Sequence, residues 1–425
     1  MAFWPRYPRA IKRLAWTVDE LDMTPAVLIV SSQARSVNSG VGTYANMILR
    51  GLSQDGSADV TVATWGDELS ADRYPGFDWM DLGSKPRFDP SPGCFWTLGR
   101  RLAQHLQATG RKFDLVHFLD AREGHAFVRS PLREGCKVIG TVHDDYAALV
   151  SWRPTYYLGK AADPWRRFFF HRWQKRLERK CYPQFDHLMV NSRATLETVQ
   201  REYALDRGRM SPISLTVEPD VGDVAIEQLP GAPNLVFSGG NFYRKGLDVC
   251  IRALPELVAE FPSLVLHVVG ACHSASKIRR LVRRLGLSAS VKFYGQVGPE
   301  RMAGMIGGAD LFVMPSRTEA LGLVYLEAFR AGVPVLAGNR GGVTEIVRDR
   351  ISGVLVAPGS SKSLADGVRM LLGSEELRRQ VVQGGFDILS DRTPDRLVRE
   401  TLAAYGLGLG EVDSSEPQSS PVGAR

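Results

Sequence analysis

The stretch that decides the fold is Ser316-Arg-Thr-Glu319-Ala-Leu-Gly322-Leu-Val-Tyr-Leu-Glu327-Ala-Phe-Arg-Ala-Gly332-Val-Pro334-Val335. The apolar run directly before it, Asp310–Met314, is typical of a buried parallel strand. A strand followed by a glycine turn and a helix directs free backbone N–H groups, and the positive end of the helix, toward a phosphate group. This order of elements therefore predicts a phosphate-binding edge on a parallel α/β sheet.

Two glutamates in this stretch are placed for ligand binding. Glu319 falls in the turn and Glu327 lies eight positions later in the helix, so we expect both carboxylates to face one cleft from different heights. One carboxylate would then suit the hydroxyls of a sugar and the other the hydroxyls of a ribose. The alternative is a pair of solvated glutamates on a helix surface, and the ordered block around them argues against it.

This block resembles the E-x7-E signature of retaining glycosyltransferases of family 4, which have the two-domain GT-B fold. The match continues into Gly341-Gly-Val-Thr-Glu345-Ile-Val347, and the resemblance extends over residues 25–400, most strongly in the second half. It implies transfer of a sugar from a nucleotide diphosphate donor with retention of anomeric configuration. It also implies that the donor is bound by Glu319, Glu327 and the residues between them, namely Ala320, Leu321, Gly322 and Leu323.

The composition is that of an intracellular enzyme. A chain of 425 residues is too long for one ordinary core and predicts two domains. The five cysteines form no C-x-x-C pair and lie near no histidine cluster, so neither a disulfide framework nor a zinc site is expected. We found no N-terminal apolar segment and no run long enough to span a bilayer. The expected location is the cytoplasm, with peripheral attachment to the cytoplasmic face of the membrane as a variant.

The positive charge of the chain bears on its partners. A net charge of +7 and a pI near 9.2 suit nucleic acid, anionic lipid or phosphorylated substrates. No zinc-finger spacing, basic zipper or RNA-recognition signature is present, which excludes nucleic acid as the expected partner. The segment Trp165–Lys180 mixes aromatic and cationic residues, as helices on anionic bilayers do. The alternative for this segment is an ordinary surface helix.

Strands alternate with helices along the whole chain, which is typical of doubly wound parallel sheets. The predicted strands are Ala26–Ser31, Asp59–Thr64, Leu115–Phe118, Val138–Val142 and His187–Val190 in the first half, and Asn234–Ser238, Leu264–Val269, Val291–Phe293, Asp310–Met314, Val333–Ala337 and Gly353–Val356 in the second. An apolar stripe with a 3.6-residue period predicts a helix over Leu247–Phe261. The fold class is therefore α/β with two Rossmann-like domains, which the resemblance places face to face across a cleft.

The predicted domain boundaries follow from composition. They are a peripheral segment 1–23, an N-terminal Rossmann-like domain 24–216 on the acceptor side, a linker 217–233 rich in proline, glycine and acidic residues, a C-terminal Rossmann-like domain 234–390 for the nucleotide sugar, a crossover helix 391–405 and a disordered tail 406–425. Thr393 and Pro394 can begin the last helix, and Gly406 can end it. In the GT-B fold the final helix usually returns to the first domain.

Glycine-rich segments flank the predicted cleft on both sides. Gly40, Val41 and Gly42 form a short loop before a helix expected over Thr43–Leu52, and this loop would meet the donor diphosphate or the acceptor. A plain tight turn is the alternative. Gly239 and Gly240 open the second domain and are followed by Arg244 and Lys245.

Lys245 is the expected cationic anchor of the diphosphate, since it stands at the start of the helix Leu247–Phe261. The family commonly places an arginine where this chain has Gly240, and Arg244 is the expected replacement. The alternative is that both cations lie on the surface before a helix. His143 ends the strand Val138–Val142 and should point into the crevice, where the resemblance implies contact with the transferred sugar. A histidine bonded only to backbone is the alternative there.

These residues suggest a reaction without a metal or cofactor, because the chain has no D-x-D motif and the nucleotide sugar is a co-substrate. Our hypothesis is front-face attack, in which the leaving phosphate takes the proton of the acceptor hydroxyl and Lys245 and Arg244 absorb the charge. Glu319 would orient the donor and is the only plausible nucleophile for a double displacement. The acceptor would be a glycan or lipid-linked molecule in cell-surface polysaccharide or glycoconjugate biosynthesis. Alternatives are a nucleotide-sugar epimerase, a phosphorylase, or a non-catalytic protein that binds sugar nucleotides.

Overall fold

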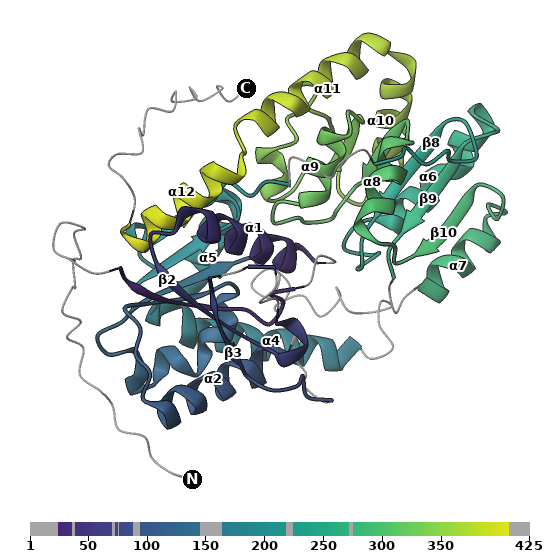
Figure 1. The fold of residues 1–425 in the computed structure, drawn as a ribbon. Helices are drawn as coiled ribbons and strands as arrows, with labels where there is room; N and C mark the ends of the chain where they lie inside the picture. Colours follow the sequence, from purple (N-terminus) through teal and green to yellow (C-terminus); the bar gives the residue numbers. More distant parts are fainter. Residues whose placement is uncertain are drawn as a thin grey trace.

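The structure is a computed structural model that describes residues 24–35, 39–69, 73–74, 76–87, 94–144, 164–217, 224–271 and 275–407, without the side chains of 164–168 and 275. The predicted peripheral segment 1–23, part of the predicted linker and the chain beyond residue 407 lie outside this description, as do the first side chains of the aromatic and cationic segment. Two α/β units are joined by a helix that runs back from the second unit to the first (Figure 1). No helix among the described residues is both long enough and apolar enough to cross a bilayer.

The first unit is built on a seven-stranded parallel sheet with the order β3-β2-β1-β4-β5-β6-β7. Its strands are β1 (Ala26–Val30), β2 (Asp59–Thr64), β3 (Asp78–Asp81), β4 (Leu115–Phe118), β5 (Lys137–Val142), β6 (His187–Val190) and β7 (Met210–Pro212). The helices are α1 (Gly40–Asp55), α2 (Phe95–Thr109), α4 (Pro164–Cys181) and α5 (Arg193–Tyr203). In register, Val27 of β1 lies beside Val60 of β2 and Leu115 of β4.

The second unit repeats this plan with six parallel strands in the order β10-β9-β8-β11-β12-β13. Its strands are β8 (Asn234–Ser238), β9 (Val265–Val269), β10 (Val291–Gly295), β11 (Leu311–Met314), β12 (Val335–Gly338) and β13 (Val354–Val356). The helices are α6 (Leu247–Glu260), α7 (Ala275–Arg284), α8 (Pro299–Gly307), α9 (Leu323–Arg330), α10 (Ser361–Gly373) and α11 (Glu375–Ser390). The sheets of both units therefore reverse their strand order at one point, between β1 and β4 and between β8 and β11.

All of the predicted strands are present, with ends shifted by two residues or fewer, and the predicted α/β class with two doubly wound sheets is confirmed. The strands β3 and β7 were not predicted. Both are short strands at the edges of their sheet, and only the central residues of β3 are even partly buried. An edge strand pairs with only one other strand and is less buried, so its sequence lacks the long apolar run of the central strands.

One prediction about the first unit was wrong. The helix expected over Thr43–Leu52 begins at Gly40, because the side chain of Ser39 accepts a hydrogen bond from the Gly42 N–H and caps the helix. Gly40, Val41 and Gly42 are therefore the first helical turn and not a loop before it. Their backbone N–H groups still lie at the positive end of α1, which favours an anion, and the contact with the diphosphate or the acceptor stays a prediction.

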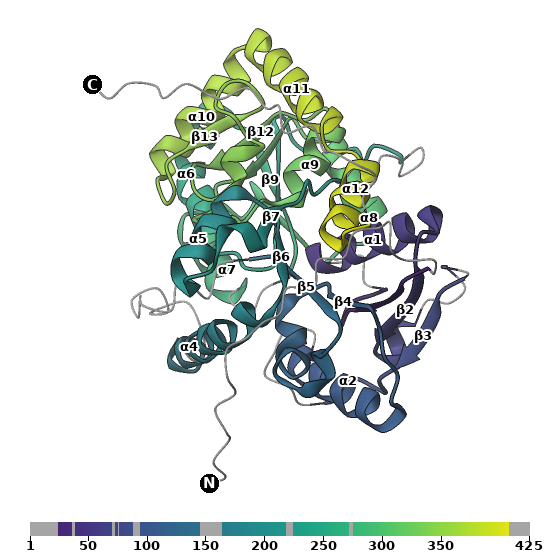
Figure 2. The ribbon, with the colours of Figure 1, turned by 90° about the vertical axis from the view of Figure 1, so that its left-hand side faces the viewer.

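The last helix, α12 (Pro394–Tyr405), docks on the first unit as predicted. Thr393 caps its start, Gly406 ends it in the left-handed conformation, and the helix packs against α1 (Figures 1 and 2). At its end, the Tyr405 hydroxyl lies 2.7 Å from Nδ1 of His117 on β4, and Nζ of Lys137 donates to the Tyr405 carbonyl at 3.0 Å. The helix thus holds the two units together through buried polar contacts as well as apolar ones.

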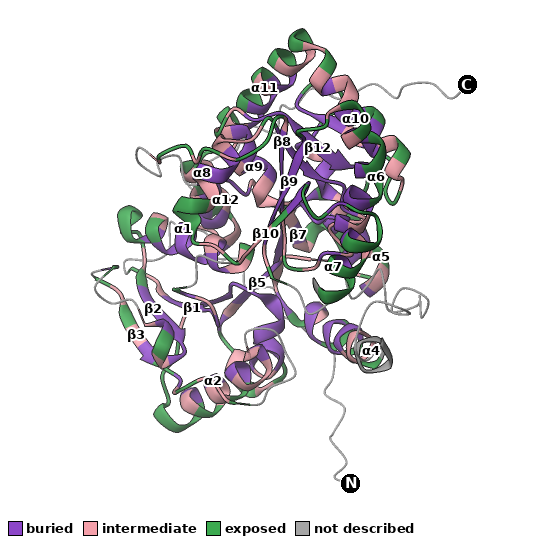
Figure 3. Cartoon of the chain, turned by 90° about the vertical axis from the view of Figure 1, so that its right-hand side faces the viewer, coloured by how far each residue is buried: buried purple, intermediate pink, exposed green. Residues whose placement is uncertain are grey.

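Apolar cores cover both faces of the first sheet. Val27 and Ile29 of β1 belong to a core shared with α1 and α12, whereas Leu28 and Val30 belong to a second core beneath α2. Burial on both faces is the pattern expected for a parallel sheet with helices on either side, and Figure 3 shows buried residues along the strands of both sheets.

The contact between α1 and α12 gives a test of this docking. A Cβ at Gly51 of α1 would lie 2.0 Å from Cγ2 of Val398, so we expect Gly51→Ala to lower stability by about 1–3 kcal/mol through overpacking. The loss should appear as a lower midpoint of thermal unfolding, and Val398→Ala in the same chain should restore it. Gly373→Ala at the end of α10, where no atom lies within 4 Å, is the control. A Gly51→Ala midpoint equal to that of the wild type would contradict the docking.

Candidate active site

Three charged residues of the second unit, Arg244, Lys245 and Glu319, lie together at the point where its strand order reverses. The strand β8 leads through Gly239 and Gly240 to Lys245, and the neighbouring strand β11 leads to Glu319. The carboxyl ends of parallel strands at such a point form the crevice in which α/β proteins bind ligands. Both loops therefore deliver their side chains to the place where a ligand is expected.

A buried ion pair forms the centre of the site. Nζ of Lys245 lies 2.5 Å from one carboxylate oxygen of Glu319, and a guanidinium nitrogen of Arg244 lies 3.5 Å from the other. The Ser316 hydroxyl donates to the same carboxylate at 3.3 Å, and Glu319 is only 6% exposed. The structure thus brings together Glu319, Lys245 and Arg244, three of the predicted catalytic residues.

The electrostatics of the pair keep Glu319 ionised. Burial alone would raise the pKa of Glu319, but the charges of Lys245 and Arg244 outweigh it and hold this pKa below its ordinary value. Burial also lowers the pKa of Lys245, against the attraction of Glu319. Glu319 is therefore an ionised carboxylate held between two cations.

The close approach of the two loops depends on Gly246. This residue has a φ of 83°, and a Cβ there would lie 2.2 Å from the Pro315 carbonyl oxygen, so no other residue fits without strain. Next to it, the Arg317 N–H donates to the Arg244 carbonyl at 2.7 Å. The Arg317 guanidinium pairs with Asp248 at 2.7 Å. These contacts clamp the Lys245 loop to the Glu319 loop.

The predicted donor-binding residues line the same edge. Gly239 passes under Lys245, since a Cβ there would lie 2.8 Å from Lys245 Cγ. Gly240 is exposed. Ala320 and Leu321 are buried after Glu319, Gly322 precedes the first turn of α9, and Leu323 begins that helix. A Cβ at Gly40 would lie 3.8 Å from Leu323, so the first turn of α1 faces the start of α9 from the other unit.

Glu327 is a predicted site residue that the structure does not join to Glu319, Lys245 or Arg244. It lies half-buried in α9, and burial raises its pKa. Among the described residues, no hydrogen bond or ion pair of its side chain is present. Its predicted role toward a ribose therefore stays a prediction.

His143 directly follows β5 in the first unit. Its Nε2 lies 2.6 Å from the Leu119 carbonyl, which can only accept, so Nε2 carries the proton. Burial lowers the pKa of His143, which leaves the ring neutral and Nδ1 with a free lone pair. Nε2 of His143 is thus bonded to the backbone, as the alternative held, while Nδ1 can accept a hydrogen bond from a ligand hydroxyl.

Sequence reasoning missed a buried acidic group at the matching point of the first sheet, where β1 and β4 are neighbours. Glu123 accepts from the Ser32 N–H at 2.7 Å, and its second carboxylate oxygen is buried without a partner among the described residues. Burial and the charge of Asp120 raise the pKa of Glu123 to about 8. Arg122 pairs with Asp120 at 2.5 Å and with Asp144 at 3.4 Å. The only sequence signal was the position of these residues just after a buried strand.

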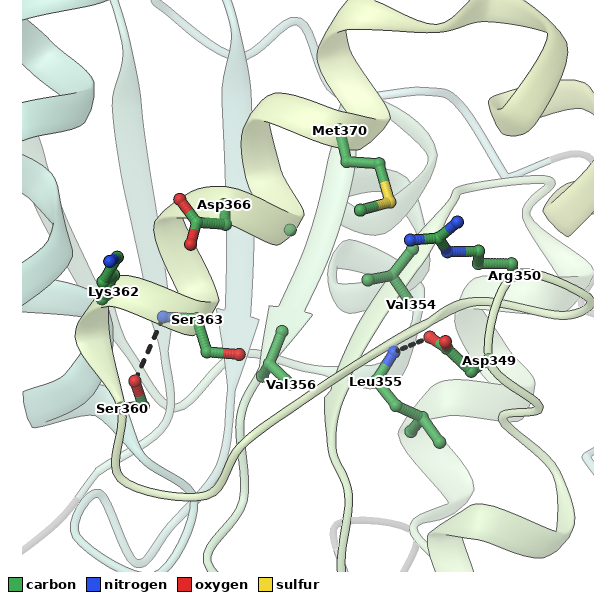
Figure 4. A pocket seen from close by; sticks show the side chains of 11 residues that line it. Asp349, Arg350, Val354, Leu355, Val356, Ser360, Lys362, Ser363, Asp366 and Met370 are labelled. Atoms are coloured by element: carbon green, nitrogen blue, oxygen red, sulfur yellow. Dashed lines mark hydrogen bonds between the residues drawn. The ribbon is translucent and has the colours of Figure 1, made fainter. Parts of the chain in front are cut away.

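A separate hollow of about 300 Å³ lies between β13 and α10 (Figure 4). Its polar residues serve local structure, because Asp349 accepts from the Leu355 N–H at 2.9 Å and Ser360 caps α10 by accepting from the Ser363 N–H at 3.1 Å. None of its lining residues belongs to the Lys245 site. Within the described part of the chain, no cluster of histidine, cysteine or acidic residues suits a metal ion.

Family models match consecutive parts of the chain. The model described as Glycosyltransferase Family 4 matches residues 38–221, and the model described as Glycosyl transferases group 1 matches residues 223–387. D-inositol 3-phosphate glycosyltransferase 2 of Catenulispora acidiphila is 36% identical over 325 residues, which are 72% of this chain and 71% of that protein. The chain belongs to the glycosyltransferases of the family 4 type.

Solved structures agree on the fold. Sucrose-phosphate synthase (tll1590) from Thermosynechococcus elongatus superposes with a TM-score of 0.73 at 20% identity, over 90% of this chain and 98% of that chain. Anabaena Alr3699/HepE in complex with UDP and glucose gives 0.66 at 18% identity, over 89% and 100%. The predicted GT-B architecture is confirmed. Two further curated relatives are aligned over 45% and 49% of their length, so the chain spans about half of those proteins.

The lowered pKa of Glu319 predicts a pH dependence of stability. Because the folded pKa is below the unfolded value of about 4.3, the ionised carboxylate stabilises the protein above that pH, and this contribution is lost as the pH falls through the folded pKa. We expect Glu319→Gln to lower the thermal midpoint near neutral pH and the difference from wild type to shrink toward pH 3. Glu197→Gln, at an exposed glutamate in the middle of α5, should show no such trend. A difference that stays constant with pH would contradict the assignment.

Proposed function

We propose that this protein is a retaining glycosyltransferase that moves a sugar from a nucleotide diphosphate sugar to a hydroxyl of a glycan or lipid-linked acceptor. The observation that carries the proposal is the convergence of Lys245 and Arg244 on Glu319 at the edge where β8 and β11 end. Two helices, α6 and α9, begin at the same place, and their positive ends favour an anion. A diphosphate is the anion that a glycosyltransferase donor brings.

The relatives support a nucleotide sugar as the donor. The structures of Anabaena Alr3699/HepE hold UDP and UDP-glucose, and the Catenulispora acidiphila relative is named as a glycosyltransferase for D-inositol 3-phosphate. We extend only the class of donor to this chain, and the base and the sugar stay open. The same reasoning makes an epimerase, a phosphorylase or a non-catalytic binding protein the alternatives to be separated by assay.

The geometry favours front-face attack over double displacement. A carboxylate nucleophile must approach the anomeric carbon from the side opposite the leaving group. Glu319 instead contacts Lys245 and Arg244, the cations that we assign to the leaving diphosphate, so it stands on the leaving-group side. In our proposal the departing phosphate oxygen takes the proton of the acceptor hydroxyl while these cations stabilise the developing charge.

The first unit supplies the other side of the proposed site. Nδ1 of His143 would accept from a hydroxyl of the transferred sugar, and the first turn of α1 would meet the donor or the acceptor beside Leu323. We also propose a cytoplasmic enzyme of cell-surface glycan or glycoconjugate synthesis that contacts the membrane through α4. Phe169 of that helix is 63% exposed and is followed by cations such as Arg172 and Arg176, which suits an anionic bilayer surface.

Binding and product analysis test the proposed reaction. At a concentration 100 times its dissociation constant, the matching nucleotide among UDP, GDP and ADP should stabilise the protein by about 2.7 kcal/mol, seen as a rise in the thermal midpoint. The NMR spectrum of the transfer product should show the anomeric configuration of the donor, with or without EDTA. An inverted product, or no stabilisation by any of the three nucleotides, would count against the proposal. Turnover of nucleotide sugar alone, or only with inorganic phosphate, would favour the epimerase or the phosphorylase.

Removal of the Lys245 ammonium tests the leaving-group role. We expect Lys245→Met, which keeps the apolar stem, to lower kcat by about 100-fold, because a well-placed donor contributes about 3 kcal/mol at the transition state. Initial rates of nucleotide release measure this effect. Lys362→Met, at an exposed lysine beside the hollow at α10, is the matched control and should leave kcat unchanged. A wild-type rate in Lys245→Met would remove this residue from the mechanism.

A further inference from the structure

We propose that Glu345 is a positioning residue that fixes the contact between the two units and, through it, the placement of Glu319 relative to His143. This inference rests on the proposed function, because it assigns both side chains to one reaction. It concerns a glutamate that touches no predicted ligand-binding residue with its own carboxylate. It acts instead through the start of α5 and the loop that carries Glu319.

The carboxylate of Glu345 crosses from one unit to the other. Glu345 ends the short turn Gly342–Glu345 of the second unit, and its two oxygens accept from the backbone N–H groups of Arg193 at 3.1 Å and Ala194 at 2.9 Å. These are the first residues of α5 in the first unit, where helical N–H groups lack partners within the helix. A carboxylate at the positive end of a helix is a favourable contact.

Gly342 allows the two units to meet at this point. A Cβ at Gly342 would lie 2.4 Å from the hydroxyl of Ser192, which caps α5, and 1.8 Å from the carbonyl oxygen of Ala320. Gly342 is therefore packed between the cap of α5 in the first unit and the loop with Glu319 and Ala320 in the second. Any side chain would push the two apart.

The same segment holds the backbone of Glu319. The Glu319 N–H donates to the Arg340 carbonyl at 3.2 Å, and Glu319 pairs with Gly341 in a parallel bridge. The chain from Arg340 to Glu345 thus lies against Glu319 at one end and is fastened to α5 at the other. The distance between α5 and the Glu319 loop therefore depends on this segment.

On the other side, α5 is connected to His143. The side-chain amide of Asn191 donates to the His143 carbonyl at 2.6 Å, and Asn191 directly precedes the cap residue Ser192. Arg392, just before α12, donates to the Leu215 carbonyl at 3.3 Å, and the charge of Glu345 partly offsets the lowering of the Arg392 pKa by burial. A continuous set of contacts therefore runs from His143 through α5 and Glu345 to Glu319.

This arrangement predicts different effects of Glu345 on nucleotide binding and on sugar transfer. Lys245, Arg244 and Glu319 all belong to the second unit, so binding of a nucleotide there does not need Glu345. Contact of His143 with the sugar does need the two units in register. Loss of the Glu345 charge should therefore lower kcat while leaving nucleotide affinity in place.

The primary experiment compares Glu345→Gln with Glu376→Gln, a change of an exposed glutamate in the first turn of α11 that stays within one unit. We expect Glu345→Gln to lower kcat for nucleotide release from the nucleotide sugar by about tenfold. Calorimetry with UDP, GDP and ADP should give dissociation constants within about threefold of wild type. Small-angle scattering without ligand should show a larger radius of gyration than for wild type or Glu376→Gln.

A second pair of variants removes the partner of Glu345. Arg193→Pro deletes the N–H that donates to Glu345, at the first helical position, where proline is tolerated and where the extended Ser192 suits a following proline. Arg193→Ala removes the side chain but keeps that N–H, so it is the reference. We expect kcat of Arg193→Pro to be several-fold below that of Arg193→Ala in the wild-type background, and this difference to disappear in the Glu345→Gln background.

The outcomes are distinct from those that test the proposed function. Equal kcat and equal scattering for Glu345→Gln and Glu376→Gln would overturn the role of Glu345, even if transfer is confirmed. A loss of nucleotide affinity equal to the loss of kcat would also overturn it, because a general structural defect would then explain both. If no nucleotide sugar is turned over, the proposed function fails, and the scattering comparison still decides whether Glu345 joins the units.

Discussion

The buried contact between Lys245 and Glu319 is the constraint on which the rest of the site depends. Moving a carboxylate and an ammonium out of water costs several kcal/mol per ion, and only a close, hydrogen-bonded pair offsets that cost. The 2.5 Å contact, with Arg244 and Ser316 beside it, provides this compensation. Neither loop can move alone without leaving a charge unpaired in the interior, so the two loops are held in one arrangement.

The strand order of the sheet determines where this ion pair forms. Because β8 and β11 are neighbours at the reversal of strand order, the loops that leave them start side by side. Gly246 then lets one loop lie against the backbone of the other. The helices α6 and α9 follow these two strands and therefore begin at the same place. The strand order thus brings the cations and the positive helix ends to one site.

Much of this could be predicted from sequence, since the relevant signals are local. The buried strands, the turn with Glu319 and the start of α6 after Lys245 each occupy a few consecutive residues. The remainder depends on residues far apart in the chain. The first turn of α1 was predicted as a loop because the cap by Ser39 was not recognised. Glu123 bonds to Ser32 and Glu345 bonds to the start of α5, and nothing in the sequence of either segment indicates its distant partner.

The ion pair also suggests how the two parts of a donor would be recognised together. A diphosphate carries more negative charge than one carboxylate and would draw Lys245 and Arg244 away from Glu319. Glu319 would then be a buried carboxylate without its cations, a costly state that burial opposes by raising its pKa. Hydroxyl groups of the donor sugar are suitable replacements, because they donate hydrogen bonds to a carboxylate. Once the diphosphate has drawn the cations away, the Glu319 carboxylate needs new hydrogen-bond donors, and the sugar hydroxyls supply them. A nucleotide without its sugar would leave this carboxylate without such donors.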